Sequence, residues 1–181
     1  MHVLVAYASH FGATKGIAER IADTLSESGL EVDLSAADVL RDAPGDGRFD
    51  AYVLGSAVHG GHWLPAARDF ACTNPAFSDR PVWLFSSGPI GDRYVGLQQP
   101  EPKEVEEIRQ RLNVRDHVVF AGAFDRSTAD FSGFGWLDRN VARRFLPEGD
   151  VRDWTAIQSW AGKIAQELGR VTAVAAGRKE V

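Results

Sequence analysis

Short apolar runs alternate with amphipathic helical patterns along most of this 181-residue chain. Continuous apolar runs at residues 3–8, 51–56 and 82–85 predict buried strands. Residues 31–34 alternate polar and apolar side chains, as a strand at the edge of a sheet does. Residues 118–124 form the last predicted strand.

Helical patterns separate these strands. The first runs from Lys15 to Glu27 and ends near Gly29. A short second helix has Pro65 in its first turn. Two further helices are marked by apolar residues at helical spacing: Val105, Ile108 and Leu112 for one, and Trp154, Ile157, Ala161, Ile164, Ala165 and Leu168 for the other.

Five strands interleaved with helices predict an α/β fold, a doubly wound five-stranded parallel sheet of order 2-1-3-4-5 with helices on both faces. We expect one domain over residues 1–169 and a flexible tail over residues 170–181. Such sheets bind ligands where the strands end, beside the first strand. The loops after the first, third and fourth predicted strands are therefore the candidate site.

The loop after the first strand has the character of a phosphate-binding loop. Backbone N–H groups at the start of a helix converge on one point, and the helix dipole favours an anion there. The loop has neither the lysine of a P-loop nor the three glycines of a dinucleotide fingerprint, which favours a mononucleotide phosphate bound without metal. Its residues are Ser9, His10, Phe11, Gly12, Ala13 and Thr14.

The other two loops are rich in glycine, and a flat heterocycle would fit between them. We expect Trp63 or His62 to stack on one face of that ring. The loop residues are Val58, His59, Gly60, Gly61, His62 and Trp63 after the third strand, and Ser87, Gly88, Pro89, Ile90, Gly91 and Asp92 after the fourth.

Together these loops resemble those of the flavodoxin family, and the resemblance spans nearly the whole chain. The phosphate loop is similar in its order of a hydroxyl residue, two positions, glycine, one position and threonine, although Phe11 stands where a hydroxyl residue is usual. The branch that includes menaquinone-dependent protoporphyrinogen dehydrogenase is the most similar. The matches to that branch are Gly61-His62 before an aromatic residue, Ala121-Gly122-Ala123, and Trp136-Leu137-Asp138-Arg139.

The resemblance implies FMN as the cofactor and electron transfer as the function. The flavin accepts one or two electrons, and the protein tunes each step through hydrogen bonds and nearby charge. The Gly60-Gly61 peptide can rotate at little steric cost and would offer its carbonyl to the reduced ring. Asp92 near the ring would disfavour the reduced anion, as in a low-potential carrier. FAD should bind poorly, because no second phosphate loop or ribose-reading acid follows the first helix.

Composition narrows the alternatives. A net charge of −5 argues against nucleic-acid binding. A single cysteine, Cys72, fits a reducing cytoplasm and predicts an inert thiol in the core. We expect no signal peptide and no membrane span. His10, His59 and His62 suggest a metal site less strongly than contacts to a flavin, because no carboxylate or thiolate accompanies them.

The segment 125–150 exceeds what a small electron carrier needs. It is predicted to cover the apolar edge of the sheet, or to act as a lid or peripheral membrane contact through Arg139, Arg143 and Arg144. The segment holds four arginines and five acidic residues. It is therefore less basic than the corresponding segment of the protoporphyrinogen dehydrogenases. We expect the partner to be a redox protein or a quinone.

Three functions thus remain open: an electron carrier, a quinone-linked enzyme similar to protoporphyrinogen dehydrogenase, and a binding module with a degenerate cofactor site. A phosphoacceptor receiver is disfavoured, because Ser9-His10 and Ser56-Ala57 occupy the places of its acidic residues.

Overall fold

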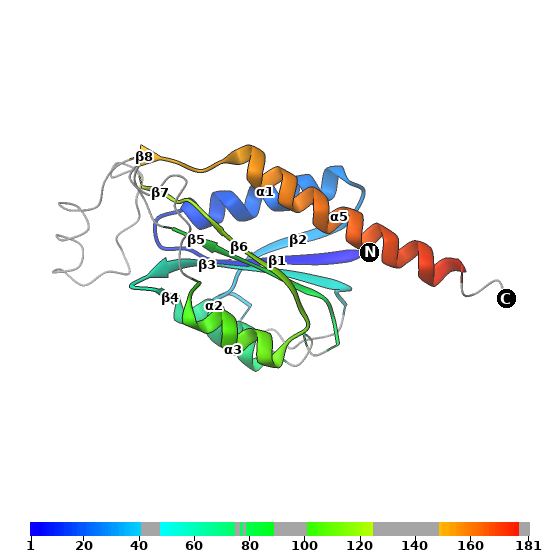
Figure 1. Ribbon diagram of the computed structural model, residues 1–181, viewed down its shortest axis with the longest axis horizontal. Helices are drawn as coiled ribbons and strands as arrows, with labels where there is room; N and C mark the ends of the chain where they lie inside the picture. The colour runs from blue at the N-terminus through cyan, green and yellow to red at the C-terminus, as the bar shows by residue number, and fades with distance from the viewer. Residues whose placement is uncertain (41–47, 75–76, 78, 89–100, 125–148, 178–181) are drawn as a thin grey trace.

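A parallel sheet forms the centre of the protein (Figure 1). The computed structural model describes residues 1–40, 48–74, 77, 79–88, 101–124 and 149–177. The parallel strands lie in the order β2-β1-β3-β5-β6, which confirms the predicted doubly wound topology. Their bounds are His2–Ala8 for β1, Glu31–Ala36 for β2, Ala51–His59 for β3, Val82–Ser87 for β5 and Val114–Phe120 for β6.

Three short strands lie outside this parallel set. Strand β4, His62–Trp63, pairs antiparallel with the end of β3. Strands β7, Ala123–Phe124, and β8, Gly149–Asp150, pair antiparallel in a small separate sheet. All three lie at the end of the molecule where the parallel strands finish (Figure 1).

Helices cover both faces of the sheet, as the sequence predicts. Helices α1, Ala13–Glu27, and α5, Trp154–Gly177, lie on one face (Figure 1). Helices α2, Pro65–Thr73, and α3, Lys103–Arg111, lie on the other. Helix α5 continues to Gly177, beyond residue 170, where we expected the tail to begin. Over the described residues, no helix is both long enough and apolar enough to cross a membrane.

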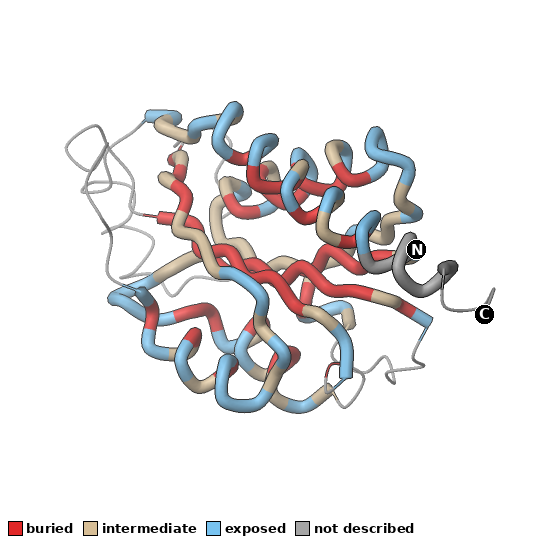
Figure 2. The backbone as a smooth tube through the Cα atoms, turned by 45° about the vertical axis from the view of Figure 1, so that its right-hand side comes forward, coloured by how far each residue is buried: buried red, intermediate tan, exposed pale blue. Residues whose placement is uncertain are grey.

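The strands alternate their side chains between two hydrophobic clusters, one under each helical layer. Figure 2 shows that buried residues run along the central strands and recur in the helices that cover them. Val3 and Val5 of β1 pack with α1 and α5, whereas Leu4 and Ala6 pack on the side of α2. A strand buried on both faces is apolar at nearly every position, which explains the long apolar runs in the sequence. Ile17 of α1 is fully buried, and each such side chain contributes about 1.5–3 kcal/mol through its removal from water.

The last parallel strand begins and ends earlier than we predicted. Strand β6 covers Val114–Phe120, whereas Phe124 belongs to β7. The prediction of 118–124 was wrong because β6 is an edge strand whose first half carries the polar residues Arg115 and Asp116. Asp116 is nevertheless paired, since it accepts a hydrogen bond from Trp160 Nε1 at 2.8 Å.

Candidate functional site

The predicted phosphate loop follows β1, at the point where the order in which the strands are added to the sheet reverses. Strand β1 has β2 on one side and β3 on the other. Helix α1 leaves β1 toward one face, and α2 leaves β3 toward the opposite face (Figure 1). The helices that follow β1 and β3 therefore diverge, and the loops between these strands and their helices border the switch point, where doubly wound folds bind their ligands.

The loop between Ser9 and Ala13 presents the start of α1 in a form suited to an anion. Gly12 has a left-handed backbone, with φ of 84°, and its N–H donates to Ser9 Oγ at 3.1 Å. In the part of the chain that the structure describes, no side-chain hydrogen bond caps α1 and no acidic residue lies in its first turn. No carboxylate of this turn therefore neutralises the positive end of the helix dipole, which favours an anion.

Phe11 stabilises this loop instead of offering a hydroxyl group. Its ring meets Phe124 of β7 edge-on, with the centroids 5.0 Å apart. The departure from the usual loop sequence therefore has a packing role.

Arg152 also supports the first turn of α1. Its guanidinium pairs with Asp150, donates to the carbonyl of Ala13 at 3.4 Å and lies 4.3 Å from the centroid of the Trp154 ring. Gly16 makes room for it, because a Cβ there would lie 2.6 Å from Arg152 Nη1.

The second loop is a tight β-hairpin that the sequence did not predict. His59 of β3 faces His62 of β4, and Gly60 and Gly61 form the turn with φ of 58° and 83°. A turn with positive φ at both central residues matches the twist of the two strands, and glycine adopts this conformation without strain. No described heavy atom lies within 4 Å of a Cβ added at either glycine, so the tip is open to a ligand.

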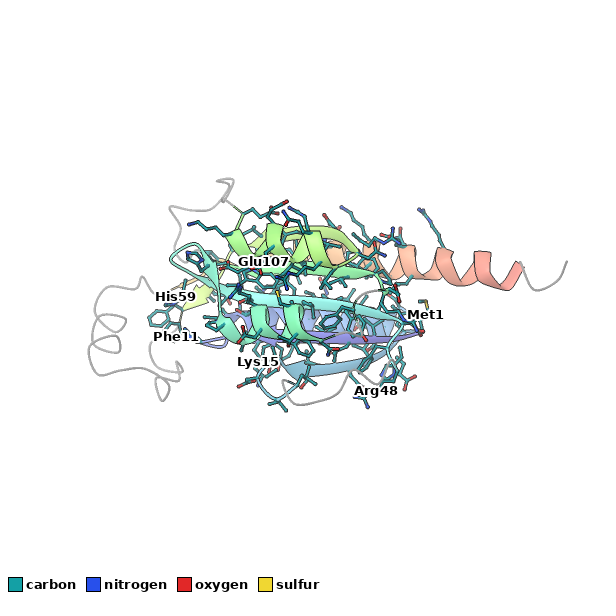
Figure 3. All side chains as sticks on the ribbon, turned by 90° about the horizontal axis from the view of Figure 1, so that it is seen from below. Met1, Phe11, Lys15, Arg48, His59 and Glu107 are labelled. Carbon is teal, nitrogen blue, oxygen red and sulfur yellow. The ribbon has the colours of Figure 1, made fainter. Side chains whose placement is uncertain are left out.

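The phosphate loop and the hairpin approach each other. The rings of His10 and His59 lie 5.1 Å apart between centroids and are tilted by 75°. Phe11 and His59 lie at the same end of the molecule, opposite Met1 and Arg48 (Figure 3). Burial, with a smaller contribution from the charge of His59, lowers the pKa of His10 below 6.5. A cavity of about 440 Å³ opens beside the loop, lined by Ser9, His10, Gly12 and Lys15 among others.

Glu104 of α3 fixes the far side of the hairpin. Its carboxylate accepts hydrogen bonds from His62 Nδ1 at 2.7 Å and from the backbone N–H of Trp63 at 3.0 Å. Burial acts to raise the pKa of Glu104, but these hydrogen bonds favour the carboxylate and hold its pKa below the usual value.

We expected either Trp63 or His62 to stack on a ligand, and the structure rules out Trp63 for this role. The side chain is buried in the core, and its indole Nε1 donates to Ser86 Oγ at 2.8 Å. The short β4 strand explains this orientation, because neighbouring residues on a strand point to opposite faces. His62 and His59, both exposed, are the rings that the hairpin leaves at the surface.

Only the beginning of the third predicted loop lies among the described residues. Ser87 is buried, and the N–H of Gly88 donates to the carbonyl of Phe120 at 3.0 Å. Gly88 also adjoins the hairpin, since a Cβ there would lie 3.8 Å from the Val58 carbonyl. The predicted site residues Pro89, Ile90, Gly91 and Asp92 lie outside the described residues, as does the segment 125–148 with Arg139, Arg143 and Arg144.

Two further kinds of site were considered, a metal site and a reactive cysteine. The described residues contain no group of three or more histidines, cysteines or acids placed to hold a metal ion. Cys72 is half-buried against the cluster under α2, and burial raises the pKa of its thiol. A thiol with a raised pKa is less reactive at neutral pH, in line with the inert role that we predicted.

These features fit a flavin mononucleotide. The uncapped N-terminus of α1, the left-handed Gly12 and the adjoining cavity fit a phosphate group. The open glycine turn lies close enough for one extended ligand to reach both loops.

Comparison with known proteins agrees with this geometry. A family model described as a flavodoxin domain matches residues 4–144. A flavodoxin from the domain Archaea superposes with a TM-score of 0.59 at 16% identity, over 93% of this chain and 99% of that one. Oxidised flavodoxin 2 from Bacillus cereus gives a TM-score of 0.53 at 25% identity, over 68% of this chain and 86% of that one.

A larger protein contains a similar domain. A point mutant of the flavo di-iron protein from Thermotoga maritima matches 92% of this chain but only 35% of its own length, with a TM-score of 0.55 and 16% identity. The fold thus occurs both alone and as part of a longer chain.

The family model covers more than three quarters of the sequence, which confirms the predicted family. FMN is the cofactor of this family, and redox chemistry is the family's general function. The chain belongs to the flavodoxin family.

Proposed function

We propose that this protein is an electron carrier that holds FMN across the switch point, with the phosphate on residues 9–14 and the ring beside the hairpin. The observation that carries the proposal is the approach of the phosphate loop to the hairpin, measured by the 5.1 Å between the rings of His10 and His59. The ring would lie between residues 58–62 and the loop that begins at Ser87.

Each loop has a distinct task in this proposal. The N–H groups at the start of α1 bind the phosphate, and Ser9 keeps the loop closed through its bond to Gly12. The hairpin borders the ring and presents the Gly60-Gly61 peptide, which can change its orientation at low steric cost. The flavin supplies one- and two-electron chemistry, and these residues orient it and tune its charge.

A quinone-linked enzyme similar to protoporphyrinogen dehydrogenase is the alternative. It depends on residues 125–150, whose arginines and aromatic residues would meet a flat or carboxylated substrate. The partners, whether a redox protein, a quinone or a membrane surface reached through Arg139, Arg143 and Arg144, are proposals of the same kind. A cytoplasmic location is proposed from the single free cysteine.

Titration with FMN, FAD and riboflavin tests the cofactor geometry. We expect quenching of FMN fluorescence on binding, with much weaker binding of FAD and of riboflavin, which lacks the phosphate. Gly12→Ala should raise the Kd for FMN at least about tenfold, because alanine is strained at the positive φ that shapes this loop. Gly29→Ala is the matched control, since Gly29 has φ of 86° and equally open surroundings but lies at the other end of α1.

Turnover separates the two redox functions. The purified protein should pass single electrons from a reduced donor to a small acceptor without oxidising a porphyrinogen with menaquinone. Porphyrinogen oxidation by the wild-type protein would favour the enzyme. Failure of both FMN binding and electron transfer would favour the degenerate binding module.

A further inference from the structure

Four residues from four parts of the chain form a hydrogen-bonded row under the hairpin. Trp63 Nε1 donates to Ser86 Oγ at 2.8 Å, and Ser86 Oγ lies 2.9 Å from His117 Nε2. His117 Nδ1 lies 2.7 Å from Glu101 Oε1, and Arg109 pairs with the same carboxylate. The row therefore joins β4, β5 and β6 to the residues that precede α3.

The chemistry of the end groups fixes the direction of every bond. An indole N–H only donates and an ionised carboxylate only accepts. Ser86 accepts from Trp63 and donates to His117 Nε2, while His117 donates from Nδ1 to Glu101. All protons are matched to acceptors when His117 is neutral, with its proton on Nδ1.

The order serine, histidine, acid is that of a hydrolase triad, but this serine is not placed to attack a substrate. Ser86 is fully buried, and the His117 side chain is only 2% exposed. Ser86 Oγ also accepts the indole proton of Trp63, which lies in the core. A nucleophile must reach its substrate, so the row has a structural role.

We propose that His117 is a positioning residue, whose neutral ring holds Ser86 and Trp63 in place and whose protonation shifts the base of the hairpin. On protonation Nε2 gains a hydrogen and no longer accepts the Ser86 hydroxyl proton, which must then turn toward another group in a buried space. The change reaches Trp63 directly and His62 through the peptide bond. Its relevance to a bound flavin rests on the proposed function, whereas the motion of Trp63 does not.

The charges that face His117 come from several elements. Glu101 lies before α3, Arg109 on α3 pairs with Glu101, and Asp116 lies beside His117 on β6. Strand β5 contributes only the neutral Ser86 hydroxyl to the row. Burial lowers the pKa of His117 and outweighs Glu101, which acts to raise it. The transition is therefore expected below pH 6.5, the usual value for histidine.

NMR of the full chain tests this link without depending on FMN. The Trp63 indole N–H is assigned from its loss in Trp63→Phe, and its chemical shift is followed with the His117 ring signals between pH 8 and pH 5. We expect both to change with one midpoint. His117→Gln should abolish the shift of the indole signal. His2→Gln is the control, because it removes a histidine at the opposite end of the sheet and should leave the shift intact.

The outcomes separate this inference from the proposed function. A Trp63 signal that stays constant while His117 titrates, or that still shifts in His117→Gln, overturns the inference. If His117→Gln does not fold, Ser86→Ala replaces it, and the indole shift should again be lost. With FMN present, the visible absorption of the flavin should change with the same midpoint. If FMN does not bind but the indole follows His117, the proposed function fails and the link stands.

Discussion

His10 and His59 face each other across the switch point, one from the phosphate loop and one from the hairpin, with ring centroids 5.1 Å apart. Burial, with a smaller contribution from the charge of His59, lowers the pKa of His10. An anion bound beside them would have the opposite effect. We therefore expect the binding of an anion at this loop to depend on pH.

We predict that FMN binds more tightly as the pH falls toward the lowered pKa of His10, below 6.5. A phosphate beside His10 raises its pKa in the complex, so the complex takes up a proton and gains affinity at lower pH. His10→Gln should remove this dependence in fluorescence titrations, and riboflavin should show none. His2→Gln should behave as the wild type. A pH dependence that survives in His10→Gln would contradict this role.

Glu104→Gln should loosen the hairpin. The carboxylate accepts from both His62 and the Trp63 N–H, and hydrogen bonds to a charged group contribute about 1.5–3 kcal/mol. Hydrogen exchange at the Trp63 N–H should therefore accelerate at least about tenfold. Glu107→Gln is the control, since Glu107 lies on the same helix but pairs with Arg68. Equal protection of the Trp63 N–H in both variants would contradict the role of Glu104 in holding the hairpin.

Replacing Gly60 or Gly61 with valine should shift the reduction potentials of the FMN-loaded protein more than it changes the Kd for FMN. Both glycines have positive φ, which a β-branched residue adopts only at a cost of about 1–2 kcal/mol. The space around them is open, so direct obstruction is minor. Redox titration provides the measurement, with Gly162→Ala in α5 as control. Unchanged potentials in both valine variants would exclude a redox role for this peptide.

Gly55→Ala should destabilise the fold. A Cβ at Gly55 would lie 1.9 Å from Phe85 Cζ, and the Phe85 ring is fully buried. Overpacking of this kind costs about 1–3 kcal/mol, measurable by urea unfolding. Phe85→Leu should partly rescue the variant, so the two changes should not be additive. Additive losses would show that the ring is not the obstacle.

The sequence predicted the sheet well because its strands are buried on both faces. The apolar runs around Val5, Val53 and Leu84 carry that signal directly, and Gly29 marks the end of α1. Strand β6 was misplaced because an edge strand shows no such run. The hairpin was missed because two residues, His62 and Trp63, are too short for a periodic pattern.

Side-chain partners far apart in sequence escaped prediction for a different reason. Glu104 is 41 residues from Trp63, and Ser86 is 31 from His117. No local pattern reports such pairs, since they depend on how the elements pack. Trp63 or His62 was expected at the ligand because an aromatic ring in a glycine-rich loop suggests stacking, but the Trp63 ring lies in the packed core and only His62 is exposed.

Amide chemical shifts on addition of FMN test the central claim most directly. Binding across the switch point predicts that the signals of Gly12 to Lys15 and of His59 to His62 shift together, while those near His2 and Asp33 at the opposite end remain unchanged. Riboflavin at high concentration should perturb the hairpin and leave the phosphate loop unaffected. Shifts confined to another part of the sheet, or no response of Gly12 to FMN at saturation, would contradict the account.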